Sequence, residues 1–187
     1  GGTGSIAYGG HYYFPVKIPA GTRLSARCQA STLSSVVRVS CLLFSQGVMP
    51  GESLGVIKTY GDNTADSGST SVDPGGVANT KGSYVQLTAS TTYPAKFLSL
   101  AIGNELNSVR SSQSWLVDVA IGAAASEVVI IPNLAFNAST SPDIITPQVY
   151  NMIPVNIPAG TRASIRAQSD GIDATDRLFD AAVYLAA

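Results

Sequence analysis

Apolar residues recur at every second position along most of the chain, the period expected of β-strands with one buried face. In the segment 115–121, for example, Val117, Val119 and Ile121 point one way and the residues between them the other. No stretch shows helical spacing. The pattern therefore predicts an all-β antiparallel fold with strands at 23–30, 37–44, 55–60, 84–89, 97–102, 115–121, 128–131, 150–157, 161–168 and 178–185. Clusters of Gly, Pro, Asn and Ser separate these short strands, which favours a β-sandwich or jelly roll.

A long internal repeat is the second constraint. Residues 15–29 recur 139 positions later as residues 154–168, with 11 of 15 residues identical. Within each copy, Ile-Pro-Ala-Gly is a turn sequence, because Pro fixes φ at the first turn position and Gly accepts a left-handed conformation. We expect both copies to form the same strand–turn–strand unit, as in a hairpin with a glycine bulge.

The spacing of the copies suggests modules in tandem. About seventy residues of predicted strands precede the second copy, whereas only fourteen residues precede the first. We expect 1–48 to be the C-terminal half of a first sandwich module that is incomplete at its N-terminal side, and 83–187 to be a complete second module. Residues 49–82 read as a linker or long loop with one short strand, because 61–82 has no apolar period. A half module exposes sheet edges, so further residues, the second module or another chain must cover it.

Charged residues make up only 12% of the chain, about half the usual share. Since surface charge keeps monomers apart, this favours burial of surface against copies of the chain or neighbouring proteins. The net charge of −1 offers no electrostatic footprint for nucleic acid, and no apolar run reaches membrane-spanning length. We therefore predict neither nucleic-acid nor membrane binding.

Residues with catalytic potential are few. The single histidine, His11, has no identifiable triad or metal partner, and no phosphate loop, zinc ligand set or serine elbow is present. The acidic strings 62–68 and 170–176 lack the spacing of a calcium loop and are typical of turns. We predict no catalytic, cofactor-binding or metal-ligating residue, no cofactor and no enzymatic activity.

Two arginines occupy one strand face in each copy: Arg23 and Arg27, then Arg162 and Arg166. They either form a row of side chains that binds acidic groups of neighbouring molecules in an assembly, or form local ion pairs with carboxylates such as Asp118 or Asp180. We favour local pairing, which stabilises a sheet modestly.

Cys28 and Cys41 fall on the inward faces of two predicted strands, which would place them opposite each other. A cross-strand disulfide is one possibility. We favour buried, unbridged neighbours, because Ala167 and Val183 at the matching places of the second copy show that packing does not need sulfur.

The aromatic residues Tyr12, Tyr13, Trp115 and Tyr150 would form a sugar-stacking platform if they faced out together. Trp115 opens a strand with an apolar inward face, so burial in the core is favoured for it.

Three motifs resemble repeats of virion structural proteins in tailed bacteriophages: Ile-Pro-Ala-Gly-Thr-Arg at 18–23 and 157–162, the segment 115–134, and the string Asp-Arg-Leu-Phe-Asp at 176–180. The resemblance implies a non-catalytic particle component, either head decoration or part of the tail or its fibres, that assembles in the host cytoplasm. Its partners would be copies of itself, trimers being common in phage appendages, and other virion proteins. The alternatives are a receptor- or carbohydrate-binding module at a fibre tip and a self-polymerising surface filament completed by strand exchange.

Overall fold

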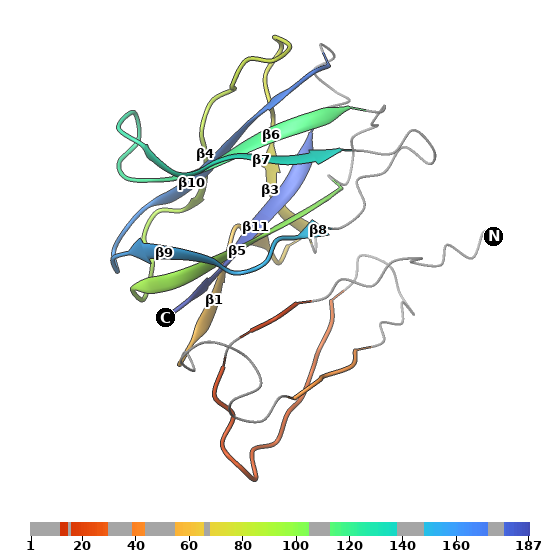
Figure 1. The fold of residues 1–187 in the computed structure, drawn as a ribbon, viewed down its shortest axis with the longest axis vertical. Helices are drawn as coiled ribbons and strands as arrows, with labels where there is room; N and C mark the ends of the chain where they lie inside the picture. Colours follow the sequence, from red (N-terminus) through yellow and green to blue (C-terminus); the bar gives the residue numbers. More distant parts are fainter. Residues whose placement is uncertain are drawn as a thin grey trace, which may run out of the picture.

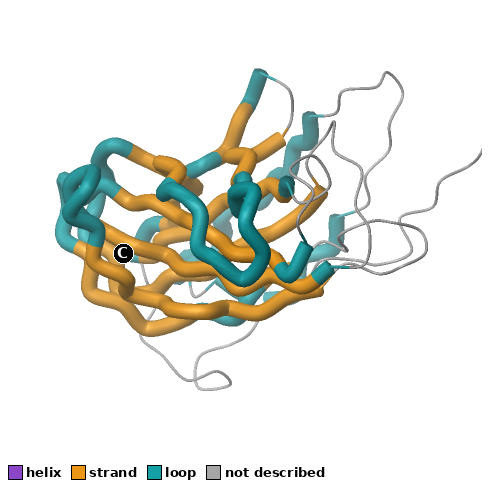
Figure 2. Tube along the Cα trace, turned by 90° about the horizontal axis from the view of Figure 1, so that it is seen from above, coloured by secondary structure: helices purple, strands orange, loops and turns teal. Residues whose placement is uncertain are grey.

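The computed structural model describes residues 12–14, 16–29, 39–43, 55–65, 68–104, 113–137, 148–171 and 178–187. These residues contain strands and loops and no helix (Figure 2). The strands are β1 (Ile57–Tyr60), β2 (Asp62–Asn63), β3 (Gly68–Val72), β4 (Val85–Thr88), β5 (Ala95–Asn104), β6 (Ser114–Ile121), β7 (Val128–Asn137), β8 (Gln148–Val149), β9 (Ile153–Ile157), β10 (Ala163–Ser169) and β11 (Phe179–Ala186). The predicted all-β antiparallel sandwich is confirmed.

Two antiparallel sheets face each other (Figure 1). One has the strand order β4-β10-β6-β7. In the other, β11 lies between β5 and the pair β1 and β3, β2 extends β3, and both β8 and β9 pair with β5. The longest ladder joins β5 and β11, from Phe179 opposite Asn104 to Ala186 opposite Phe97.

The core lies between the sheets and is built by the period-two pattern. On β11 the inward side chains of Phe179, Ala181, Val183 and Leu185 are buried. Trp115 of β6 stacks on Phe136 of β7 at 4.8 Å, and both rings meet Phe179 edge-on. The predicted burial of Trp115 is thus confirmed, and this aromatic cluster joins the two sheets.

The short strand predicted at 55–60 is confirmed as β1, but the interpretation of its surroundings as a linker is wrong for residues 57–63 and 68–72. Strands β1 and β3 both pair with β11, and β2 pairs with β3, so these residues belong to the C-terminal sandwich. The pattern missed β3 because its sequence, Gly-Ser-Thr-Ser-Val, has only one apolar residue, Val72, which is fully buried. Backbone pairing with β11, rather than an apolar period, holds it in place.

The strands predicted at 23–30 and 37–44 are also wrong, as far as their residues are described. Residues 17–29 and 39–43 are exposed, and the described residues before Gly55 form only a single bridge at Val16. In Figure 1 these segments, coloured red and orange, lie outside the two sheets.

Candidate functional site

The second copy of the repeat is an integral part of the sandwich. Its first strand, β9, places Ile157 opposite Ala95 of β5, and its second strand, β10, lies between β4 and β6. The side chains of Ile157, Ala163, Ile165 and Ala167 are at most 1% exposed. This copy therefore shows the environment for which the repeated sequence is suited.

The described part of the first copy, residues 16–29, keeps the turn but forms no strand. Gly21 and Gly160 share a φ of 79°, and the Thr22 N–H donates to the Pro19 carbonyl at 3.2 Å. We call residues 16–29 the N-terminal arm. Ile18 and Leu24, which correspond to buried Ile157 and Ala163, are 39% and 46% exposed. The prediction of identical strand–turn–strand units is thus confirmed for the turn and wrong for the strands.

Arg166 confirms the predicted local ion pair. It lies opposite Asp118 on β6, and its Nε contacts the Asp118 Oδ2 at 3.0 Å. Lys81 Nζ contacts the other carboxylate oxygen at 2.8 Å, and the Asn133 N–H donates to that oxygen at 3.0 Å. The Arg166 guanidinium also lies 4.5 Å from the ring centre of Tyr84, a cation–π contact.

These contacts set the protonation of Asp118. Burial alone would raise the pKa of this carboxyl, but the hydrogen bonds from Lys81, the Asn133 N–H and Arg166 outweigh burial and lower the pKa below its ordinary value. Asp118 is therefore charged at neutral pH and compensated by two cations. The sequence pointed to Arg166 and Asp118, but Lys81, in a loop before β4, carries no period that would have indicated it.

The other arginine of the second copy is also paired within the sandwich. Arg162 Nη1 contacts Glu127 Oε1 at 2.9 Å and donates to the Gly122 carbonyl, while its Nε donates to Gln86. Asp180, the other carboxylate expected to pair, accepts a hydrogen bond from the Ser69 N–H at 3.0 Å. In the arm, the matching Arg23 and Arg27 are exposed and form no ion pair with any described residue.

A short aromatic segment precedes the arm and packs on the outer face of the sheet that contains β11. Tyr12 and Phe14 meet the ring of Tyr184 edge-on at 5.7 and 5.5 Å. Burial is the largest cause that raises the pKa of Tyr184 to about 12, and the neighbouring Tyr12 is the next largest. The outward position of Tyr184, between inward Val183 and Leu185, is the one sequence signal for this contact.

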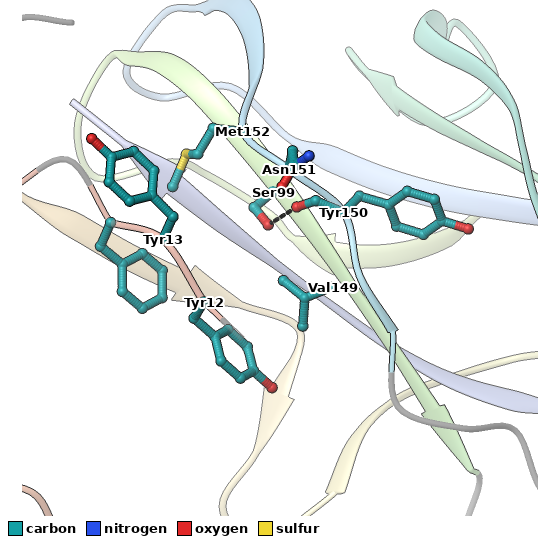
Figure 3. A pocket seen from close by; sticks show the side chains of 8 residues that line it. Tyr12, Tyr13, Ser99, Val149, Tyr150, Asn151 and Met152 are labelled. Carbon is teal, nitrogen blue, oxygen red and sulfur yellow. Dashed lines mark hydrogen bonds between the residues drawn. The ribbon is translucent and has the colours of Figure 1, made fainter. Parts of the chain in front are cut away.

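A cleft lies beside this segment, lined by Tyr12, Tyr13 and Phe14 on one side and by Ser99 and residues 149–152 on the other (Figure 3). The Ser99 hydroxyl donates to the Tyr150 carbonyl. The ring of Tyr150 points away from Tyr12, and its hydroxyl donates a hydrogen bond to the Ala135 carbonyl at 2.7 Å. The cleft has room for little more than a water molecule. Of the four predicted platform residues, only Tyr12 and Tyr13 present exposed rings here.

The remaining sequence candidates form no reactive site among the described residues. Cys28 and Cys41 are free, as predicted, but both are exposed, so their predicted burial is wrong: the strands that would have buried them are not formed. Within the described ranges, no three His, Cys, Asp or Glu side chains could hold a metal ion together. His11 and most of the string 170–176 lie outside the described residues; Asp170 accepts the Ser114 N–H.

Comparison with protein-family models, curated proteins and solved structures gave no match to this chain. The described part of the chain contains no helix long and apolar enough to cross a membrane.

Proposed function

We propose that the protein is a non-catalytic structural component of a tailed-bacteriophage particle, on its head surface or in its tail or fibres, and that it acts by protein–protein association. The phage assignment rests on the motif resemblance alone. The association rests on one structural observation, the exposure of the N-terminal copy of a sequence whose other copy is buried.

The exposed large apolar side chains are concentrated in one stretch of the sequence. Of the twelve large hydrophobic side chains that are exposed among the described residues, eight lie between positions 12 and 43. They are Tyr12, Tyr13, Phe14, Ile18, Leu24, Val39, Leu42 and Leu43. Clustered apolar surface marks an interaction site more often than single exposed residues do, and burial against a partner would stabilise it.

Light scattering coupled to gel filtration tests the association. We expect the full chain to form a defined homo-oligomer that buries more than roughly 1,000 Å² per contact, the size of a specific interface. A chain that is soluble, stable and monomeric at all accessible concentrations would contradict association between copies. Detection of the protein in purified phage particles tests the phage assignment separately.

The alternative of a carbohydrate-binding module is favoured by one observation. Tyr12 and Tyr13 are 47% and 38% exposed, and exposed Asn151 lines the opposite side of the same cleft. Aromatic faces beside an amide are suited to sugar rings, although the cleft itself is too small to enclose one. Binding on a glycan array that is lost in Tyr13→Ala would favour this alternative.

A further inference from the structure

We propose that the N-terminal arm is a docking element whose partner is the sandwich of a second copy of this chain. This inference rests on the proposed function, since it names the surface and the partner through which the association occurs. It begins from the second repeat copy, because that copy shows which contacts the repeated sequence forms when it is covered.

The covered copy forms two kinds of contact. Its strand β10 pairs with a strand on each side, β4 and β6. Its arginines form ion pairs, Arg162 with Glu127 and Arg166 with Asp118. The arm retains the turn and both arginines, but its side chains from Lys17 to Gln29 are all exposed. Its requirements are therefore a sheet edge and acidic side chains.

Charge points to a second copy as the partner. The sequence before residue 55 has four bases and one acid, a net charge of +3, whereas residues 55–187 have seven bases and eleven acids, a net charge of −4. The bases before residue 55 are Lys17, Arg23, Arg27 and Arg38, and the acid is Glu52. A basic arm and an acidic sandwich on the same chain attract each other between copies and steer their encounter.

The sandwich carries exposed carboxylates that basic side chains of another chain can contact. Three of its five described bases, Lys81, Arg162 and Arg166, are used in pairs with Asp118 and Glu127. Among its other described carboxylates, Asp62, Asp73 and Asp170 are exposed. These acids form no ion pair with a described residue. One oxygen of Asp73 accepts the Gly75 N–H and one oxygen of Asp170 accepts the Ser114 N–H, and the second oxygen of each can accept from a guanidinium group of another chain.

The sandwich also has sheet edges. In the sheet with the order β4-β10-β6-β7, the end strands β4 and β7 each have one described strand neighbour. The β7 edge is interrupted by Pro132, which lacks an N–H, and by Asn133 with a φ of 53°.

The position of β10 inside the sheet is less suited to the arm, because the arm has Leu24 in place of Ala163 and Ala26 in place of Ile165. That exchange would overpack one position and leave a cavity at the other. We therefore expect the arm to dock on an edge rather than to displace β10.

Charge reversal with a matched control tests the inference. The test variant is Arg23→Glu/Arg27→Glu, and the control is Lys58→Glu/Lys96→Glu, which makes the same change in formal charge at two exposed lysines of the sandwich. Sedimentation equilibrium of the full chain at ~0.02 M and ~0.5 M salt measures the dissociation constant of the oligomer.

We expect the arm variant to raise the dissociation constant at least roughly tenfold at low salt and to reverse the sign of its salt dependence, because the arm then carries net negative charge and salt screens its repulsion from the acidic sandwich. The control should not weaken association. An oligomer that the arm variant leaves intact, or that both variants weaken equally, would overturn the inference and leave the proposed function standing. A wild-type chain that is monomeric at both salt concentrations would contradict the self-association on which both depend.

Discussion

The two repeat copies share 11 of 15 residues and a turn with the same glycine φ, yet one is core and the other is surface. The difference lies in their surroundings. Residues 163–169 have a strand on each side, β4 and β6, whereas the arm forms one bridge, at Val16, and no strand. A turn is encoded locally by Pro and Gly, but a strand needs a partner for its backbone groups. This comparison shows which part of the repeat is a local property and which part depends on a partner.

The largest expected difference is at the shared isoleucine. Ile157 is 1% exposed and Ile18 is 39% exposed. Ile157→Ala should lower the free energy of unfolding by about 3 kcal/mol, because it removes buried methyl groups and leaves a cavity. Ile18→Ala should change it by less than about 0.5 kcal/mol. Urea unfolding of the monomeric chain measures both values, and equal losses would show that the arm is packed.

The shared arginine should give a smaller difference. Arg166→Met keeps the aliphatic stem but removes the contacts to Asp118 and Tyr84. We expect a loss of about 1–2 kcal/mol, discounted because the Arg166 side chain is 30% exposed and Asp118 retains Lys81. Arg27→Met should leave stability unchanged in the monomer. The arm contacts its own sandwich through the Gln29 side-chain amide, which donates to the Thr64 carbonyl. A measurable loss in Arg27→Met would mean that Arg27 also has a partner within its own chain.

Acid titration tests the charge of Asp118, the carboxylate that Arg166 of the second copy contacts. The pKa of Asp118 is lowered in the folded state, so its charge stabilises the fold above its ordinary pKa of 3.8. That stability is lost as the pH falls through the lower, folded-state pKa. Wild type should therefore be more stable than Asp118→Asn at neutral pH, and the difference in their free energies of unfolding should shrink as the pH falls from 3.8 through the lowered, folded-state pKa of Asp118. A constant difference down to low pH would contradict the charged, paired state of Asp118.

The smallest expected effect is at the shared glycine. Both Gly21 and Gly160 have a φ of 79°, and an added Cβ would touch nothing within 4 Å at either position. Gly160→Ala should cost about 1 kcal/mol through backbone strain alone. Gly21→Ala should cost the sandwich nothing, because its turn is not coupled to the core. Thermal unfolding distinguishes the two variants, and a loss in Gly21→Ala as large as in Gly160→Ala would show coupling.

The alternation predicted most strands of the sandwich, because a buried face forces apolar residues to every second position. It failed in two opposite ways. Strand β3 has a polar sequence and is held by pairing with β11, so no apolar period reveals it. Residues 23–29 have the period but no described partner strand. The alternation of strand faces also predicted that Arg166 pairs with a carboxylate such as Asp118. It could not predict the contact of Lys81 with Asp118, or those of Tyr12 and Phe14 with Tyr184, because these depend on how distant segments pack.

Residue-resolved amide hydrogen exchange on the dilute, monomeric chain tests the central comparison most directly. The backbone amides of 163–169 lie in a sheet core and should exchange more than roughly a thousandfold more slowly than unprotected amides, as only extensive unfolding exposes them. The amides of residues 23–29 should exchange within about tenfold of the unprotected rate. Comparable strong protection in both copies would contradict the account, because it would mean that the arm already belongs to a sheet of its own monomer.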